Sequence, residues 1–156
     1  MTELTGTLRQ RIDAAMRWNS GAVSHDDVLH FCGVYRAAGI ELLPSAMELY
    51  KQYGHMFREH ALIFEDAGYN GEFVFVFYSD LPVSDRKKIR TLQEALAAMD
   101  SVYAFAGQQT CPIGEIGFYY PPIVYIGEDG TLYCVHDYED EIRVYGTPED
   151  IMEYEL

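Results

Sequence analysis

Apolar residues recur three and four positions apart in the first third of the chain, which is the spacing of amphipathic helices. A first helix is predicted over residues 8–16, before the stop Asn19-Ser20-Gly21. A second helix is predicted to open at the capping-box pair Ser24 and Asp27 and to end at Gly39. The N-terminal third is therefore expected to be helical.

Two more helices are indicated further along the chain. One opens at Pro44-Ser45, with Ser45 and Glu48 as the capping pair, and closes at Gly54. The other opens at Thr91 with Glu94, and its apolar stripe comprises Leu92, Ala95, Leu96 and Met99.

Between these two helices the pattern changes to that of strands. Two runs, Ala61–Phe64 and Phe73–Tyr78, are predicted as strands separated by residues 68–71. The second run is apolar on both faces, so we expect a central strand covered by helices.

The last third reads as a loop, three strands and a helix. The loop is predicted over residues 108–115, and a hairpin joins Ile123–Ile126 to Thr131–Val135. A third strand, Ile142–Tyr145, precedes a short helix that opens at Thr147-Pro148-Glu149-Asp150. Because the chain shows no repeat and no linker, residues 1–156 are expected to form a single α+β domain, with an antiparallel sheet flanked by N-terminal and C-terminal helices.

Composition favours a folded protein. Apolar residues make up 49% and aromatic residues 14% of the 156 residues, which is enough to bury a core. No apolar run approaches the length of a membrane helix, and the start lacks a signal-peptide pattern, so we expect a cytoplasmic location. The three cysteines, Cys32, Cys111 and Cys134, form no CxxC pair and are expected to be reduced.

Charge is divided unevenly along the chain. Residues 1–90 hold 10 basic and 12 acidic side chains, whereas residues 91–156 hold 1 basic side chain, Arg143, and 13 acidic ones. The two parts therefore carry charges of -2 and -12, which sum to the formal net charge of -14. Such a field repels nucleic acid and anionic membranes and attracts a basic partner, although it also serves solubility.

A search for chemistry finds no catalytic or cofactor pattern. Gly114-Glu115-Ile116-Gly117 lacks the lysine and glycine spacing of a phosphate loop, and GxSxG and HExxH are absent. The acidic stretch 136–141 lacks calcium-loop spacing, and an acidic setting disfavours a reactive cysteine. The basic run Arg86-Lys87-Lys88 is interpreted as a solvated loop rather than as a nucleic-acid contact, because phosphate binders usually carry a whole basic face. We therefore expect no cofactor, no metal and no enzymatic activity.

Three segments in order carry a family resemblance. They are Ala38–Ala46 leading to Tyr53-Gly54, then Cys111-Pro112-Ile113-Gly114-Glu115, and finally Ile126–Tyr133 followed by Gly146–Asp150. Their order and spacing resemble the SUKH superfamily of immunity proteins, nearest its third subfamily, over roughly residues 15–156. The resemblance implies a SUKH-like fold and a bacterial protein that binds and neutralises a cognate toxin, often a nuclease.

The partner-binding surface is predicted on the acidic C-terminal half, because charge steers a basic partner while interleaved aromatic residues anchor it. The predicted contact residues are Glu115, Tyr119, Tyr120, Glu128, Asp129, Asp137, Tyr138, Glu139, Asp140 and Glu141. The alternative for each acid is a solvated loop. Two other functions stay open: a regulatory or scaffold protein of the same fold that binds an endogenous partner, and a small enzyme with a dispersed site.

Overall fold

The computed structural model describes residues 7, 9–10, 12–13, 23–54, 61–66, 69–77, 94–116, 122–135 and 142–155. Its elements are α2 (His25–Ala38), α3 (Pro44–Tyr53), β1 (Ala61–Asp66), β2 (Tyr69–Phe77), α5 (Met99–Ala106), β3 (Thr110–Ile116), β4 (Ile123–Gly127), β5 (Leu132–Val135), β6 (Ile142–Tyr145) and α6 (Pro148–Glu155). The α+β class and the antiparallel sheet are thus confirmed. No helix within these ranges is long and apolar enough to cross a membrane.

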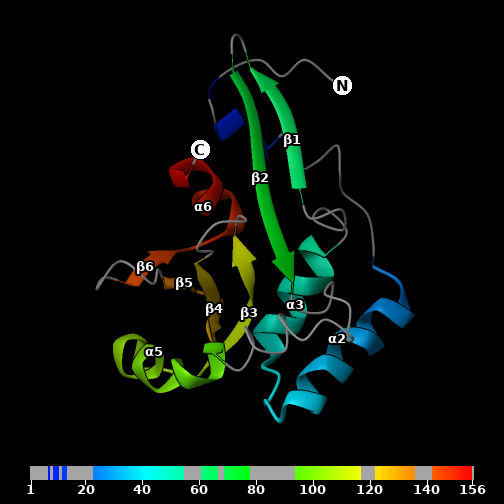
Figure 1. The fold of residues 1–156 in the computed structure, drawn as a ribbon, viewed down its shortest axis with the longest axis vertical. Helices are drawn as coiled ribbons and strands as arrows, with labels where there is room; N and C mark the ends of the chain where they lie inside the picture. Colours follow the sequence, from blue (N-terminus) through cyan, green and yellow to red (C-terminus); the bar gives the residue numbers. More distant parts are fainter. Residues whose placement is uncertain are drawn as a thin grey trace.

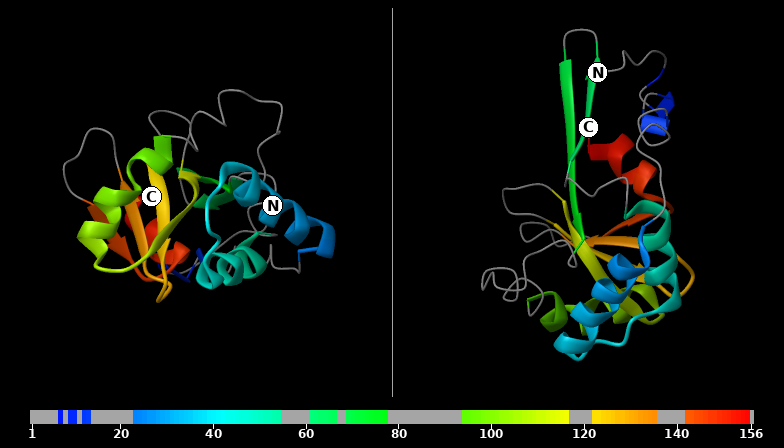
Figure 2. Two further views of the ribbon diagram at one scale, coloured as in Figure 1. Left: turned by 90° about the horizontal axis from the view of Figure 1, so that it is seen from below. Right: turned by 90° about the vertical axis from the view of Figure 1, so that its right-hand side faces the viewer.

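The sheet follows the order of the chain. Its six described strands lie in the order β1-β2-β3-β4-β5-β6, and every neighbouring pair is antiparallel. Figure 1 shows the long β1–β2 hairpin extending away from the other strands. Seen from below in Figure 2, α5 lies on one side of β3 and β4, whereas α2 and α3 lie on the other.

Local capping signals define the helical N-terminal part. The Ser24 hydroxyl accepts a hydrogen bond from the Asp27 N–H (3.1 Å) and the Asp27 carboxylate accepts one from the Ser24 N–H (3.2 Å), which is the predicted capping box of α2. Gly39 ends α2 in the left-handed conformation, with φ of 74°. The first predicted helix is described only at residues 9–10 and 12–13, which are helical; the rest of it, with its stop, lies outside the described residues.

The predicted cap of α3 is wrong in one respect. Pro44 does open the helix, but its N-cap is Leu43 and no side chain caps it. The Ser45 hydroxyl instead donates a hydrogen bond of 2.7 Å to the carbonyl oxygen of Gly127. Ser45 therefore fixes α3 to the end of β4, which is a tertiary role that a local pattern does not reveal.

The β1–β2 hairpin differs from the prediction at its turn. The segment Tyr69–Gly71, expected in the connection, belongs to β2 and pairs with Phe64, Glu65 and Asp66 of β1. Strand β2 also pairs with β3, but only over Phe75–Phe77. Among the described residues, β1 pairs with Tyr69–Val74 and β3 with Phe75–Phe77, so no residue of the strand expected to be central is paired on both sides.

The predicted loop at residues 108–115 is mostly strand. Thr110–Ile116 forms β3, and its register against β4 shifts between Pro112 and Gly114. This β-bulge explains the error, because proline and glycine are typical of loops but are also tolerated in sheets at bulges. Ile113, between these two residues, has a fully buried side chain and anchors the bulge in the core.

The helix predicted from Thr91 is described from residue 94 onward. A short helical turn covers residues 94–97, and α5 runs from Met99 to Ala106 before Gly107 ends it in the left-handed conformation. Thr91 and Leu92 lie outside the described residues. Ala95 is buried, as its stripe predicts.

The C-terminal elements match the sequence pattern closely. Strands β4 and β5 form the predicted hairpin, with Gly130 at φ of 88° in its turn, and β6 spans the predicted residues. Thr147 and Asp150 exchange backbone-to-side-chain hydrogen bonds of 3.1 and 3.2 Å in front of α6, and Pro148 is its first residue.

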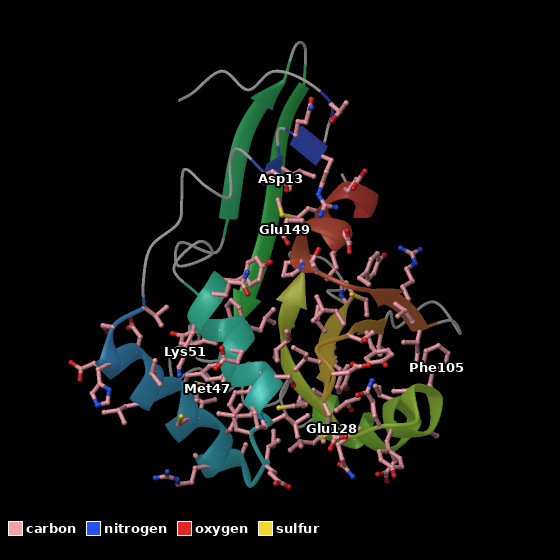
Figure 3. The ribbon with its side chains drawn as sticks, turned by 180° about the vertical axis from the view of Figure 1, so that it is seen from behind. Asp13, Met47, Lys51, Phe105, Glu128 and Glu149 are labelled. Atoms are coloured by element: carbon pink, nitrogen blue, oxygen red, sulfur yellow. The ribbon has the colours of Figure 1, made fainter. Side chains whose placement is uncertain are left out.

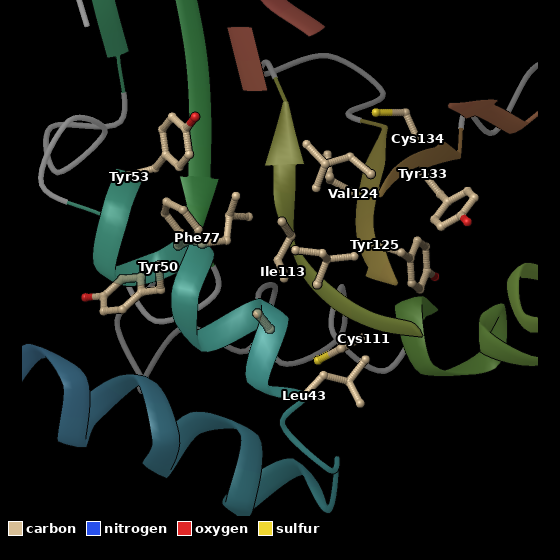
Figure 4. Packing of buried hydrophobic residues seen from close by; sticks show 14 of the residues in the cluster. Leu43, Tyr50, Tyr53, Phe77, Cys111, Ile113, Val124, Tyr125, Tyr133 and Cys134 are labelled. Atoms are coloured by element: carbon tan, nitrogen blue, oxygen red, sulfur yellow. The ribbon is translucent and has the colours of Figure 1, made fainter. Parts of the chain in front are cut away.

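The core lies on both faces of the sheet, with one part packed under α2, α3 and α6 and the other under α5. Figure 4 shows Phe77, Ile113 and Val124 facing α3. Phe31 of α2 stacks on Tyr50 of α3 with ring centroids 4.2 Å apart, and Phe77 meets both rings edge-on. This aromatic cluster joins the helices to β2.

One buried hydrogen bond ties α2 to the bulge of β3. The hydroxyl of Tyr35, a fully buried residue, donates to the carbonyl oxygen of Pro112 at 2.5 Å. The bulge, which interrupts the pairing of β3 with β4, is therefore held in place by α2, a helix that packs on the sheet.

Candidate protein interface

The most exposed aromatic side chains of the described C-terminal half lie on α5. Tyr103 is 49% and Phe105 is 54% exposed. The Phe105 ring packs edge-on against the buried Tyr133 of β5, with centroids 6.2 Å apart. Val144 of β6, 53% exposed, pairs with Tyr133 and therefore lies on the same face of the sheet. Phe105 and Val144 thus share one face, whereas Tyr103, two positions before Phe105, projects from a different side of α5. We call these three exposed residues together the α5 surface.

Acidic residues flank the α5 surface. Asp100 lies in the first turn of α5, and Glu128 is exposed in the turn between β4 and β5. Figure 3 shows Phe105 and Glu128 at the same end of the molecule, beside α5. Residues 91–142 contain no lysine or arginine, so every formal charge that the sequence adds here is negative.

Asp129, a predicted contact residue, holds the β4–β5 turn together. Its carboxylate accepts hydrogen bonds from the Thr131 N–H and from the Gln108 amide, each at 2.9 Å. The Gln108 side chain also accepts from the Asp129 N–H (3.1 Å) and donates to the Tyr133 hydroxyl (2.9 Å). The bond from Thr131, followed by that from Gln108, lowers the pKa of Asp129 below its usual range. Asp129 is thus a turn-forming residue, whereas the neighbouring Glu128 side chain is exposed.

Glu115 lies at the other end of the sheet. It pairs with Ile123, which pairs with Val135, which pairs with Ile142, so these four residues form one row across β3 to β6. Along β4 this row lies about 13 Å from Gly127, at about 3.3 Å per residue. The structure therefore does not bring Glu115 and Glu128 together.

Seven of the predicted contact residues are not placed. Tyr119, Tyr120, Asp137, Tyr138, Glu139, Asp140 and Glu141 lie outside the described residues. The chain segments that contain them follow β3 and β5, whose last residues lie at the Glu115 end of the sheet. The predicted surface is therefore divided between two ends of the sheet, with Glu128 and Asp129 at one and Glu115 at the other.

Part of the C-terminal acidity is used within the fold. The Arg9 guanidinium forms ion pairs with Asp150 (2.7 Å) and Glu153 (3.0 Å) of α6 and with Asp13 (3.3 Å). Hydrogen bonding to Arg9 lowers the pKa of Asp150. The Tyr53 hydroxyl donates to the Glu149 carboxylate at 2.8 Å. The acids of α6 thus link the two ends of the described chain. The acidic residues near α5 are therefore the better candidates for contacts with a partner protein.

The two buried cysteines are unsuited to nucleophilic chemistry. No disulfide joins the three cysteines, and Cys111 and Cys134 are buried. Burial raises the pKa of Cys111 to about 12, so its thiol stays protonated near neutral pH. Within the described ranges, no group of three or more His, Cys, Asp or Glu side chains is arranged to hold a metal ion.

A pocket of 220 Å³ lies between α5 and the start of β3. Its lining consists of Met99, Asp100, Tyr103, Gln109 and Thr110. Thr110 is only 5% exposed, and among the described residues its hydroxyl has no hydrogen-bond partner. The Thr110 hydroxyl is thus closed off from the pocket, although the residue lies in its wall.

Sequence reasoning missed Tyr103 and Phe105. The helix MDSVYAFA carries apolar residues on all sides, which is a signal of a helix buried all round or of one with an exposed apolar face. Only the packing of α5 against a single layer distinguishes the two cases.

Comparison with known proteins adds no relatives. No family model, no curated protein and no solved structure matches this chain.

Proposed function

We propose that this chain is a cytoplasmic bacterial immunity protein, which binds a cognate protein toxin with a basic surface and neutralises it without a cofactor. The observation that carries the proposal is the coincidence of exposed aromatic side chains with a cation-free acidic segment. Tyr103 and Phe105 project from a segment, residues 91–142, that holds nine acids and no lysine or arginine. The three-segment resemblance to the SUKH superfamily supports the same function.

Physical reasoning connects these features with protein binding. Negative charge accelerates encounter with a basic partner, whereas most of the binding energy comes from a few apolar or aromatic side chains that become buried. A toxin that acts on nucleic acid must itself present positive charge. The exposed rings of α5 and the acids of the same segment offer both kinds of contact.

A growth assay tests the function directly. The open reading frame beside this gene would be expressed in a bacterial host with and without the present chain, and growth and complex formation would be measured. We expect the neighbouring product to arrest growth, and co-expression to restore it through a stable complex. A neighbouring product that is harmless, or toxic with and without this chain, refutes the immunity function; a harmless partner that still binds supports the regulatory or scaffold alternative.

Charge variants test which end of the sheet meets the partner. One variant neutralises Asp100 and Glu128 with Asn and Gln, and the other neutralises Asp137, Glu139, Asp140 and Glu141 in the same way. The variant whose substitutions lie in the interface should associate with the partner more slowly, and its association rate should depend less on salt concentration. Its free energy of unfolding should change little. Unchanged association in both variants would exclude the acidic half as the interface.

A further inference from the structure

Strand β6 forms one edge of the described sheet. It is the last strand in the sheet order and pairs with β5 alone, in a regular register over Ile142–Tyr145. Edge strands are commonly protected by a proline, a bulge or a charged residue. Strand β6 has no proline and no bulge, and its one charged residue, Arg143, lies on the face of the sheet opposite Val144. The apolar side chain of Val144 is 53% exposed at this edge.

The hydrogen bonds of the β4–β5 hairpin show which backbone groups of β5 point to β6. The Gly127 N–H donates to the Thr131 carbonyl oxygen at 2.8 Å, so these opposed residues form a hydrogen-bonded pair. Opposed pairs with and without hydrogen bonds alternate along an antiparallel ladder. Tyr133, two positions after Thr131, therefore directs its N–H and C=O groups to β4, whereas the residues on either side of Tyr133 direct theirs to β6.

The same alternation identifies the outward groups of β6. The residues on either side of Tyr133 pair with Tyr145 and Arg143, so these two residues turn their backbone groups to β5. The N–H and C=O groups of Ile142 and Val144 therefore point away from β5, where the described part of the chain places no strand. Such groups can donate to and accept from the backbone of an additional strand.

Acidic residues precede this edge strand in the chain. Residues 136–141 include Asp137, Glu139, Asp140 and Glu141 and no lysine or arginine. A second copy of the chain would bring the same acids to the edge and itself carries a formal charge of -14, so pairing of two copies is repelled. A segment rich in lysine or arginine is instead attracted. Charge therefore favours a basic segment of another protein as the occupant of the edge.

We propose that β6 pairs with an extended basic segment of the partner protein, which adds one more strand to the sheet. The proposal rests on the function proposed above and names the way in which the partner binds. The backbone of the added segment bonds to Ile142 and Val144, which supplies affinity that does not depend on side chains. Its alternate apolar residues lie on the α5 side, beside Val144 and Phe105, and its basic residues meet the acids.

Amide hydrogen exchange tests the edge first in the free protein. The amides of Ile142 and Val144 should exchange at least about tenfold faster than those of Arg143 and Tyr145, because only the second pair points to β5. Equal exchange rates at the four positions would overturn the proposal, since no outward-pointing pair would then exist.

A synthetic peptide then serves as the probe. A short capped peptide of alternating valine and lysine, at millimolar concentration, should slow exchange at Ile142 and Val144 in a saturable way. A valine–glutamate peptide should not, because its charge is repelled. The valine–lysine peptide N-methylated at every residue keeps its charge but lacks the N–H donors, so it should not protect either amide. Protection by the methylated peptide, or no protection at β6 up to about 10 mM of the unmethylated one, would overturn the proposal.

Matched variants separate the edge from general charge. Val144 and Leu29 are 53% and 56% exposed, on β6 and α2 respectively, and each can be replaced by lysine. Val144→Lys should weaken binding of the valine–lysine peptide at least about fivefold, because like charges then face each other across the new strand pair. Leu29→Lys should leave binding unchanged, and neither variant should lower the melting temperature by more than about 4 °C. Equal weakening in both variants would reduce the effect to net charge and refute the strand pairing.

The two proposals fail in different ways. If the chain restores growth but the peptide protects no amide of β6, immunity stands and the strand pairing is refuted. If the peptide pairs with β6 but no toxin is neutralised, the immunity function is refuted and the strand pairing stands.

Discussion

Replacing Tyr35 with phenylalanine tests the link between α2 and the bulge of β3. The change keeps the buried ring, which contacts Phe31 at a centroid distance of 5.0 Å, and removes only the hydroxyl that donates to Pro112. Loss of a hydrogen bond to a buried carbonyl costs about 1–3 kcal/mol. For a domain of this size each kcal/mol shifts the melting temperature by about 2–4 °C, so we expect a decrease of about 2–12 °C.

The measurement is urea and thermal unfolding followed by circular dichroism. Tyr103→Phe is the matched control, because it removes the same hydroxyl from a half-exposed ring and should change the free energy of unfolding by less than about 0.5 kcal/mol. Unfolding free energies of Tyr35→Phe and Tyr103→Phe that agree within that margin would refute the reasoning, and so would a changed denaturant slope without a changed midpoint.

Three further predictions concern the turn, the ion pairs and the thiols. A Cβ added at Gly127 would lie 2.6 Å from Cδ of Gln108, so Gly127→Ala should displace that side chain and cost about 1–2 kcal/mol. In a Gln108→Ala background the same change should cost little, and additive losses in the double-mutant cycle would contradict this. Arg9→Gln should cost under about 1 kcal/mol per ion pair. Because the folded-state pKa of Asp150 is lowered, its stabilisation is present above the unfolded pKa of about 4 and is lost as pH falls through the folded value. The gap in unfolding free energy between wild type and Arg9→Gln should therefore close between about pH 5 and about pH 2, and a gap that widens refutes the pair. Finally, a thiol reagent should modify Cys32 alone in the native protein, since it is the one cysteine that is partly exposed, and all three cysteines in urea; rapid native labelling of a second thiol would contradict the burial.

Features that depend on neighbouring residues could be predicted from the sequence. The capping pairs Ser24–Asp27 and Thr147–Asp150 form as expected, because each joins residues three positions apart. Gly39 and Gly130 likewise stand where the backbone adopts positive φ. In each case the residues that determine the structure lie within a few positions of one another in the sequence.

Features that depend on distant partners were missed. Ser45 could not be recognised as a tertiary donor, because its acceptor on Gly127 is 82 positions away. The strand at Thr110–Ile116 was hidden by Pro112 and Gly114, whose loop-like character is accommodated by a bulge against β4. The exposure of Tyr103 follows from which side of α5 meets the sheet, and the helix sequence does not specify that side.

The sequential strand order has a consequence for how quickly this protein folds. Every pairing of the described sheet joins strands that are neighbours in the chain, and all but the β2–β3 pairing, which encloses α5, close short loops. The helices instead dock across long separations, as Tyr35 does to Pro112 over 77 positions and Arg9 to Asp150 over 141. Docking of the N-terminal helices therefore closes the longest loops of the described fold, each at a greater entropic cost than a hairpin.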